Sequence, residues 1–296
     1  MASLIEVRKK IGGVKNTKKI TKAMQLVATS KMKLFQRKAI STRNYVWDLL
    51  KTLGQNLEAG SESVFTEKRT QGKILFVLYT SDKGLCGALN ANMIKTLFRS
   101  DRWKETPVHD RLLLTIGKKA YDYAKSSKIK VEKHFTGMPE NLKTIDTLPI
   151  IDTILTYWMS GEVKEVIFVA PHFHNTFTFY PRLKTYLPFS QEMIETHLGH
   201  QKKEMPKEPL NPGYMFYEPS QARVVEYLFE MVTQGMFIQS FFELKASEYS
   251  SRMLAMQNAT DSADKIIVDL TRVYNKTRQQ VITQQLAELI GASEQV

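Results

Sequence analysis

Proline is absent from both ends of this sequence of 296 residues, because all ten prolines fall between Pro107 and Pro219. Proline breaks helices, so its absence permits long uninterrupted helices in the two terminal segments. Residues Gln221 to Ile290 are mostly helix formers that carry an apolar stripe, and Met1 to about Leu57 reads similarly. The sequence therefore predicts two long helices on either side of a proline-containing centre.

Cysteine and long apolar runs are also scarce. The one cysteine, Cys86, excludes an internal disulfide framework and a cysteine-based metal cage. No apolar run is long enough to span a bilayer, and the first residues, MASLIEVRKK, lack the core of a signal peptide. Ser3 to Glu6 instead reads as a capping box that opens a helix at once. We therefore expect a mature start in the cytoplasm, without a leader.

Acidic residues are nearly missing from the first arm. Residues 1–43 hold twelve Lys and Arg and one acid, Glu6, within a net charge of +12 for the whole chain. Such an arm favours an acidic partner, which is a nucleic acid, an anionic lipid or an acidic protein surface. Aromatic residues are few before Phe35, whereas surfaces that bind single-stranded nucleic acid usually interleave aromatics with bases. We favour an acidic protein, with a basic nucleic-acid-binding or scaffold coiled coil as the alternative.

Each arm carries its apolar residues at a spacing of three and four, which is typical of an amphipathic helix. The first arm has the rows Leu4, Val7, Ile11, Val14 and Ile20, Met24, Val27, Leu34. The last arm has Leu228, Val232, Phe242, Ala246, Tyr249, Met253, Met256, Ala263, Ile267, Leu270, Tyr274 and Val281. A helix of about 70 residues is roughly 105 Å long and needs another helix or an enclosing partner. Gly12 and Gly13 either allow close approach or a bend, or are tolerated surface glycines.

The centre of the chain alternates between strand and helix patterns, which predicts a mostly parallel sheet with helices on its faces. The expected strands are 73–79, 111–116, 129–135 and 165–170, with an edge strand in 176–188. The expected helices are 88–99, 118–125 and 146–160, and 191–212 reads as an exposed loop. The predicted fold class is α/β: a long antiparallel coiled coil of the terminal helices with an inserted Rossmann-like α/β domain. We expect shaft helices at 1–58 and 220–292 that pair with each other, and the central domain at 72–212.

No set of residues with the pattern of a catalytic site is evident. Thr80 to Gly87, TSDKGLCG, follows a strand as phosphate-binding loops do, but it matches neither a Walker loop nor GxGxxG. A nucleotide enzyme that uses this turn is a further alternative. Cys86 is expected to be a buried structural thiol. His172 and His174 have a spacing that could bind metal, but without nearby acids or cysteines a loop or edge-strand role is favoured. We expect no catalytic residue, no metal and no cofactor.

Three long motifs and one loop resemble a known family. Residues 11–32, IGGVKNTKKITKAMQLVATSKM, closely resemble the N-terminal signature of the gamma subunit of F-type ATP synthase. Residues 246–260, ASEYSSRMLAMQNAT, and 274–291, YNKTRQQVITQQLAELIG, resemble its C-terminal signature, and SDKGLCG resembles the loop after its first central strand. The motifs follow in the family's order across the whole chain.

The resemblance implies a rotor. In this family the terminal helices form an asymmetric coiled coil inside a hexamer of alternating alpha and beta subunits. The α/β domain contacts the epsilon subunit and the membrane ring of c subunits. Ion flow turns ring and shaft, catalysis occurs on the beta subunits, and the gamma subunit regulates ATPase activity and proton flow without a cofactor. The resemblance thus implies a peripheral protein on the cytoplasmic side of a bacterial inner membrane, attached indirectly through the c ring, with no nucleic acid as partner.

The resemblance also implies contact residues. Positions that touch the alpha and beta subunits in the family correspond here to Lys18, Lys22, Lys83, Arg252, Arg278, Gln279 and Thr283. Two features depart from the family pattern: Gln285 stands where glutamate is frequent, and Gly12-Gly13 stands where alanine or serine is usual. The cysteine-bearing regulatory insertion of chloroplast relatives is missing, so thiol control is not expected. Residues 285–292, QLAELIGA, have mostly small or aliphatic side chains, which suits a helix end that rotates inside the hexamer without binding it tightly.

Overall fold

The computed structural model of the chain describes residues 4–60, 62–199 and 217–293. These residues form two compact units. The terminal unit comprises residues 1–30 and 252–296, and the sheet unit comprises residues 31–251. The capping box expected from Ser3, and residues 200–212 of the expected loop, lie outside the described residues. No described helix is both long and apolar enough to cross a membrane.

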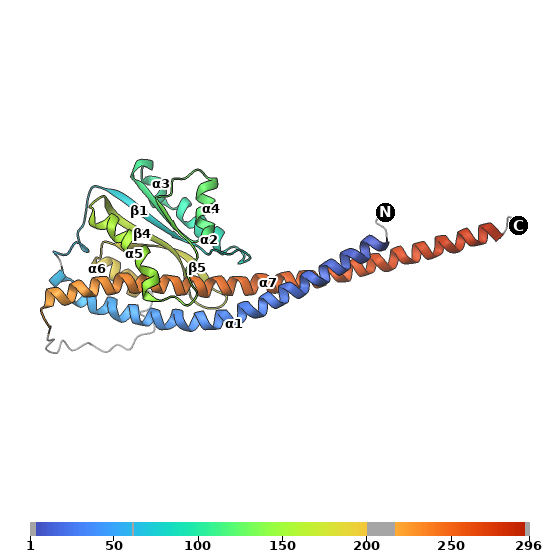
Figure 1. Cartoon of the computed structure of the whole chain (residues 1–296), viewed down its shortest axis with the longest axis horizontal. Helices are drawn as coiled ribbons and strands as arrows, with labels where there is room; N and C mark the ends of the chain where they lie inside the picture. Colours follow the sequence, from blue (N-terminus) through green and yellow to red (C-terminus); the bar gives the residue numbers. More distant parts are fainter. Residues whose placement is uncertain (1–3, 61, 200–216, 294–296) are drawn as a thin grey trace. The chain divides into compact units, whose positions relative to one another are not determined.

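Two long helices contribute to both units, as the proline-free arms predict. Helix α1 runs from Leu4 to Asn56 and helix α7 from Gln221 to Ser293, neither with a break. In the terminal unit their segments lie side by side and antiparallel (Figure 1), since Lys18 contacts Asp264 while Thr21 contacts Thr260. The confirmed feature is therefore the pair of long terminal helices around a central sheet.

The buried row of α1 differs from the second predicted row. Ile20, Val27 and Leu34 are 61%, 57% and 44% exposed. Their next neighbours along the chain, Thr21, Ala28 and Phe35, are the buried residues, and they continue the seven-residue repeat that begins at Val7. The prediction was wrong because it followed the largest apolar side chains. A coiled pair maintains its seam by a seven-residue repeat, even where the seam residues are small.

Gly12 and Gly13 are exposed on α1. A Cβ atom added at either position would meet nothing within 4 Å. The helix continues through both glycines. Among the described residues no other helix approaches them closely, so they are tolerated surface glycines.

The sheet unit contains one five-stranded sheet. Its strands are β1 (Lys73–Tyr79), β2 (Arg111–Ile116), β3 (Lys133–Phe135), β4 (Val163–Phe173) and β5 (Phe179–Leu187). The spatial order is β3-β2-β1-β4-β5. Strands β1 to β4 pair in parallel, and β5 pairs antiparallel with β4. Strand β5 lies at the edge of the sheet, where an edge strand was expected in 176–188. The helices of this unit besides α1 and α7 are α2 (Leu89–Arg99), α3 (Asp101–Glu105), α4 (Lys118–Ser126), α5 (Thr144–Met159) and α6 (Gln191–Gly199), with single 3₁₀ turns η1 (Glu58–Gly60) and η2 (Val108–Asp110).

Three of the predicted elements in this unit were wrong in extent or type. The strand expected at 165–170 is longer and runs from Val163 to Phe173 as β4. The third strand is only three residues long, because the ladder with β2 joins Leu114–Ile116 to Lys133–Phe135 and no more. Residues 191–199 form helix α6 instead of a loop. This helix begins where the Ser190 hydroxyl accepts a hydrogen bond from the Met193 amide at 3.1 Å, and it buries Met193 and Ile194.

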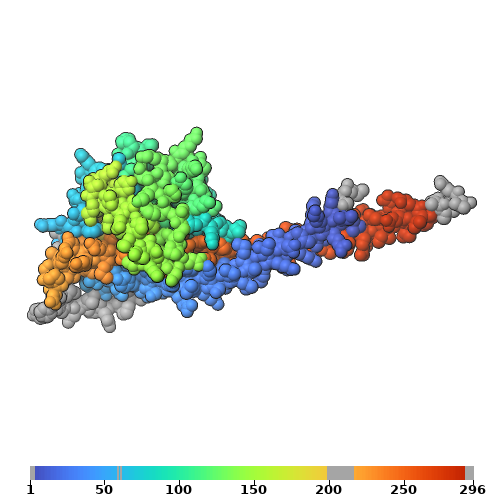
Figure 2. Space-filling model, viewed as in Figure 1, coloured from blue at the N-terminus to red at the C-terminus, as the bar shows by residue number. Residues whose placement is uncertain are grey.

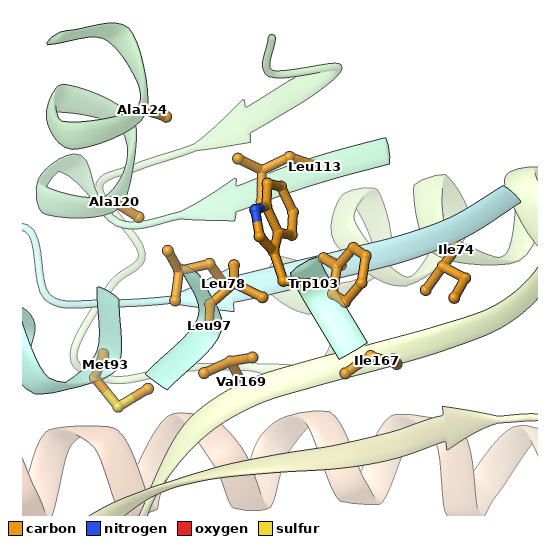
Figure 3. Close-up of a cluster of buried hydrophobic side chains, with 11 residues drawn as sticks. Ile74, Leu78, Met93, Leu97, Trp103, Leu113, Ala120, Ala124, Ile167 and Val169 are labelled. Carbon is orange, nitrogen blue, oxygen red and sulfur yellow. The ribbon is translucent and has the colours of Figure 1, made fainter. Parts of the chain in front are cut away.

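One face of the sheet is covered by short helices. Figure 3 shows Met93 and Leu97 of α2, Trp103 of α3, and Ala120 and Ala124 of α4 packed over the sheet. The sheet side chains below them are Ile74, Phe76, Leu78, Leu113, Ile167 and Val169. These side chains alternate along the strands, as they must for one face of a pleated sheet.

Helix α7 covers the other face. Phe237 stacks on Tyr79 of β1 with ring centroids 6.0 Å apart, and it meets Phe168 of β4 edge to face. The Tyr186 hydroxyl of β5 donates to the Thr233 carbonyl oxygen. Next to these contacts, Gly235 faces α1, and an added Cβ would lie 3.1 Å from Val46 Cγ2. Gly235 is therefore a place where α1 and α7 approach closely.

Candidate partner-binding surfaces

The terminal unit is held by a narrow seam with few large side chains. The hydroxyl oxygens of Thr21 and Thr260 lie 2.8 Å apart and are buried, so each hydroxyl has a partner on the other helix. Near them the buried residues include the small Ala28 and Ala263 and one larger apolar side chain, Met256. Small seam residues let the helix backbones approach closely and leave most longer side chains on the outside.

Lys18 and Lys22 lie on the first helix next to this seam. Lys18 Nζ forms an ion pair with Asp264 Oδ1 at 2.5 Å, and both side chains remain partly exposed, at 39% and 51%. Lys22 is exposed, and its ammonium donates to Gln25 Oε1 at 3.2 Å. An exposed ion pair contributes at most about 1 kcal/mol, so a partner's carboxylate competes with Asp264 at little cost.

The C-terminal part of α7 presents three of the predicted residues. Arg278, Gln279 and Thr283 are exposed, and the Thr283 hydroxyl donates back to the Gln279 carbonyl oxygen at 2.9 Å. Figure 2 shows this part of α7 extending past the described end of α1 within the terminal unit. Exposed apolar side chains lie on the same stretch, namely Val281, Ile282, Leu286, Leu289 and Ile290. This stretch has an exposed surface of mixed apolar and polar character, which is typical of a contact surface.

Arg252 differs from the other predicted contact residues because it is only 7% exposed. Little of its side chain is accessible from outside this chain. The sequence alone does not distinguish this arginine from an exposed one. Its neighbours in SSRMLAM do not show whether position 252 lies on the buried or the exposed face of the helix.

The loop that contains Lys83 is tied down by hydrogen bonds from its own side chains. Asn90 Oδ1 accepts from the Ser81 amide at 3.0 Å, and Asn90 Nδ2 donates to Ser81 Oγ at 2.8 Å. Asp82 accepts backbone N–H bonds from Lys118 at 2.9 Å and from Gly137 at 3.1 Å. The polar groups that a nucleotide phosphate would need are thus already used to join this loop to its neighbours. This arrangement argues against the nucleotide-enzyme alternative.

Lys83 itself is exposed on this loop, beside an open depression of about 350 Å³. The depression has basic groups in Lys83, Lys118 and Lys245. Its acidic groups are Asp82, Glu140 and Glu248. Within it, Glu140 accepts from the Lys31 ammonium at 2.5 Å and from the Tyr249 hydroxyl. Burial opposes ionisation of Glu140, but these hydrogen bonds and the charge of Lys31 lower its pKa below the usual value.

Cys86 lies in the same loop and is 2% exposed. Its sulfur is 3.1 Å from Asn90 Nδ2, and its carbonyl oxygen accepts from the Ser251 hydroxyl of α7. The prediction of a buried structural thiol is confirmed. Gly87 is in the left-handed region at φ +54°, and an added Cβ would lie 3.1 Å from Ser251 Oγ. The glycine therefore permits the close approach of the loop to α7.

A buried charged cluster was missed by the sequence analysis. Glu243 of α7 is 4% exposed, and its carboxylate accepts from Arg43 Nε at 3.0 Å and from the Phe173 amide at 3.2 Å. His172 Nδ1 lies 3.0 Å from Oε2, the carboxylate oxygen that also accepts from the Phe173 amide. Burial opposes ionisation of Glu243, yet these bonds and the charge of Arg43 lower its pKa to about 2. Burial also lowers the pKa of His172, against the pull of Glu243.

The cluster explains His172 better than a metal site does. His172 lies on β4 and faces α7, whereas His174 follows the end of that strand and is exposed. The two histidines thus do not converge on one point. The usable signal in the sequence was an acid within the apolar run around Phe241 and Phe242, because a buried carboxylate requires partners.

Comparison with known proteins finds similarity to one family over nearly the whole chain. A family described as "ATP synthase" matches residues 3–296. A protein of Symbiobacterium thermophilum described as "ATP synthase gamma chain" is 34% identical over 294 residues, which cover 97% of this chain and 96% of the relative. One of Exiguobacterium sibiricum with the same description is 30% identical over the full length of both chains.

Solved structures share the fold. A chain of the mitochondrial ATP synthase of Tetrahymena thermophila, described as "central stalk/cring", superposes with a TM-score of 0.60 at 24% identity, over 81% of this chain and 99% of that one. A chain of the Euglena gracilis enzyme, described as "OSCP/F1/c-ring", superposes with a TM-score of 0.65 at 20% identity, over 98% and 93%.

Proposed function

Because this chain belongs to the ATP synthase family, as a gamma subunit in the central stalk of an F-type ATP synthase, we propose that its paired helices couple ion flow through the membrane to ATP synthesis and hydrolysis on other subunits. The observation that carries this proposal is the match over the full length of curated gamma chains. In this proposal the chain is a rotor subunit without a catalytic site, and the beta subunits hold the chemistry. It also regulates ATPase activity and proton flow.

The terminal unit supports a mechanical role. A shaft that transmits torque needs two helices in contact, and here the Thr21–Thr260 bond and the Lys18–Asp264 pair join them. Beyond this pairing, the end of α7 is exposed on all sides, with no described residue buried after Ala263. A helix end with exposed Leu286 and Leu289 requires an enclosing partner to cover its apolar surface.

We assign this partner to the hexamer of alpha and beta subunits. The contacts proposed for it are Lys18, Lys22, Lys83, Arg252, Arg278, Gln279 and Thr283. Six of these side chains are exposed or partly exposed, and Arg252 offers only its small accessible part. The basic first arm suits acidic segments of beta, because complementary charge speeds and orients association. This assignment favours a protein partner over nucleic acid.

We place the epsilon subunit and the membrane ring of c subunits against the sheet domain. The description of the Tetrahymena structure, which names a central stalk with its c ring, supports the second of these partners. The protein would then be peripheral on the cytoplasmic side of a bacterial inner membrane, held there through the ring. We retain 1–58, 72–212 and 220–292 as the division into first shaft helix, central domain and second shaft helix.

Co-expression with alpha and beta subunits of one bacterial enzyme tests the proposal. We expect a sub-complex with three alpha, three beta and one copy of this chain, read by native mass spectrometry. The chain alone should hydrolyse no ATP, and the sub-complex should. A chain that stays apart from the hexamer, while binding duplex DNA with an affinity that falls steeply with salt, would favour the basic coiled-coil alternative.

A further inference from the structure

A charged cavity lies inside the sheet unit, between strands β4 and β5 and the helices α1, α6 and α7. It has two adjoining chambers of about 40 and about 30 Å³. His172, Arg182, Lys184, His197 and Gln239 line both chambers. A single water molecule needs at least about 10 to 15 Å³ in the same measure, so the chambers have room for a small ion of several heavy atoms.

Positive charge exceeds negative charge in this cavity. Arg43, Arg182 and Lys184 are its cations, and Glu243 is the one carboxylate among the described lining residues. The Glu243 oxygens already accept from Arg43, His172, the Phe173 amide and Gln239 Nε2, the last at 2.9 Å. Arg182 Nη2 donates to the Tyr180 hydroxyl at 2.6 Å, which leaves its charge uncompensated.

Two donors in the cavity have no acceptor. The Lys184 ammonium forms no hydrogen bond or ion pair with any residue that the structure describes, although the Lys184 backbone is paired with β4. Trp47 lines the smaller chamber, and its indole N–H is buried and lacks an acceptor among the described residues. Of the two donors, only the indole N–H is fully buried, and a buried donor without an acceptor destabilises the fold. A water molecule would satisfy the indole but would leave the excess positive charge in place.

We propose that this cavity binds one small inorganic oxyanion of the sulfate or phosphate class, held by Lys184, Arg182 and the indole N–H of Trp47. Guanidinium and ammonium groups together with a neutral N–H donor are the usual ligands of such oxyanions. The small volume of the two chambers fits a small anion better than a nucleotide. The inference uses only the sheet unit, and it does not depend on the proposed rotor function.

Lys184 gives the site a pH dependence. Burial lowers its pKa to about 8, and the charges of Arg182 and Arg43 act in the same direction against Glu243. The groups that face it are Arg43 from α1, His172 from β4, Arg182 from β5, His197 from α6 and Glu243 from α7. An anion that requires the charged ammonium therefore binds well at pH 7 and loses affinity as the pH rises above about 8.

Isothermal titration of the full chain with sodium sulfate tests the proposal, since sulfate does not titrate between pH 7 and 9. Sodium chloride at matched ionic strength is the reference. We expect one saturable site at pH 7 and an affinity about tenfold weaker at pH 9, because about a tenth of Lys184 stays charged there. A repeat with sodium phosphate at pH 7 identifies which of the two oxyanions binds more tightly.

Variants locate the site. Lys184→Met should weaken sulfate binding at least about tenfold, and the conservative Trp47→Phe should weaken it by a smaller factor. Lys164→Met, which changes a partly buried lysine on the neighbouring strand β4 outside the cavity, should bind as the unaltered chain does. The absence of saturable binding, or equal loss in the Lys184 and Lys164 variants, would overturn the proposal. An affinity that is equal at pH 7 and 9 would overturn the pH dependence assigned to Lys184.

Discussion

Glu243 is the residue whose ionisation should matter most to the stability of the sheet unit. Its pKa is about 2 in the folded chain, below the usual value of 4.5, because donors from α1 and β4 surround it. A lowered pKa stabilises the fold at pH values above the unfolded pKa, and this stabilisation disappears as the pH falls toward the folded pKa. The contribution is thus complete above about pH 5 and is lost toward pH 2.

We expect Glu243→Gln to lower the free energy of unfolding by about 3 kcal/mol at pH 7, because it leaves Arg43 buried without its anion. The difference from the unaltered chain should shrink below about pH 4. Tryptophan fluorescence in urea measures this change, since Trp47, Trp103 and Trp158 all lie in the sheet unit. Glu226→Gln, which breaks an exposed pair with Arg223, is the control and should cost less than about 1 kcal/mol. A pH-independent difference would contradict the assignment.

Gly117 should be the least replaceable glycine of the sheet unit. It lies in the left-handed region at φ +93°, and an added Cβ would lie 2.0 Å from the Thr80 carbonyl oxygen. Backbone cannot move aside here, because Thr80 is itself bonded to the Ile116 carbonyl oxygen at 2.8 Å. We expect Gly117→Ala to destabilise the unit by at least about 3 kcal/mol in urea unfolding.

Gly137 provides the comparison for this glycine. Its φ is also positive, at +74°, but an added Cβ would meet nothing within 4 Å. Gly137→Ala should therefore cost only the left-handed penalty of about 1 to 2 kcal/mol. If the two substitutions lower the free energy of unfolding equally, the contact between the new Cβ and Thr80 does not contribute to the loss of stability.

At the scale of elements, the first helix should gain stability from a better helix former. Gly12 and Gly13 are exposed in mid-helix with open space around them. We expect Gly12→Ala and Gly13→Ala each to stabilise α1 by about 1 kcal/mol. Hydrogen exchange of the amides in residues 4–30 measures the gain. Gly235→Ala should show no such gain, because Val46 Cγ2 lies 3.1 Å from the new methyl group.

Elements with a strong local pattern were predictable from the sequence. The run KILFVLY became the central strand β1, because six of its seven residues are buried between two layers of helix. The proline-free arms became α1 and α7 with nearly the predicted bounds. In these segments the local conformational preference agrees with the tertiary packing. The pattern of residues along the sequence is therefore enough to predict the element.

The errors arose where tertiary contacts determine which residues are buried or which conformation a segment adopts. Thr21 and Ala28 are buried because they meet the other helix, whereas their own hydrophobicity would not select them over Ile20 and Val27. Residues 191–199 form a helix because this conformation buries Met193 and Ile194 within the sheet unit. The pairing of His172 with Glu243 joins residues 71 positions apart, which no local spacing reveals.

For the whole molecule, the end of α7 is the segment most suited to a test of coupling. Residues 286–290 are exposed and contribute no packing to the described terminal unit. We expect deletion of residues 286–296 to leave assembly with the hexamer intact and to weaken coupling modestly. Deletion from Arg278 onward should reduce ATP-driven ion pumping severalfold relative to ATP hydrolysis, because the proposed contacts Arg278, Gln279 and Thr283 are removed.

Both activities are measurable in membrane vesicles that contain the assembled enzyme. Native mass spectrometry of each truncated complex controls for loss of the subunit itself. Full coupling after the deletion from Arg278 would remove these residues from the contact set.

The attachment of α7 to the sheet has a consequence for torsion. Phe229 and Phe237 are fully buried, the first against Phe65 and Phe189, the second against the sheet at Tyr79 and Phe168. Turning the helix about its own axis within this unit would expose both rings and break the Glu243 cluster. Each exposed phenylalanine alone costs about 2 to 3 kcal/mol. Slippage between helix and sheet is therefore suppressed, and any twist applied to one of them is transferred to the other without loss of register.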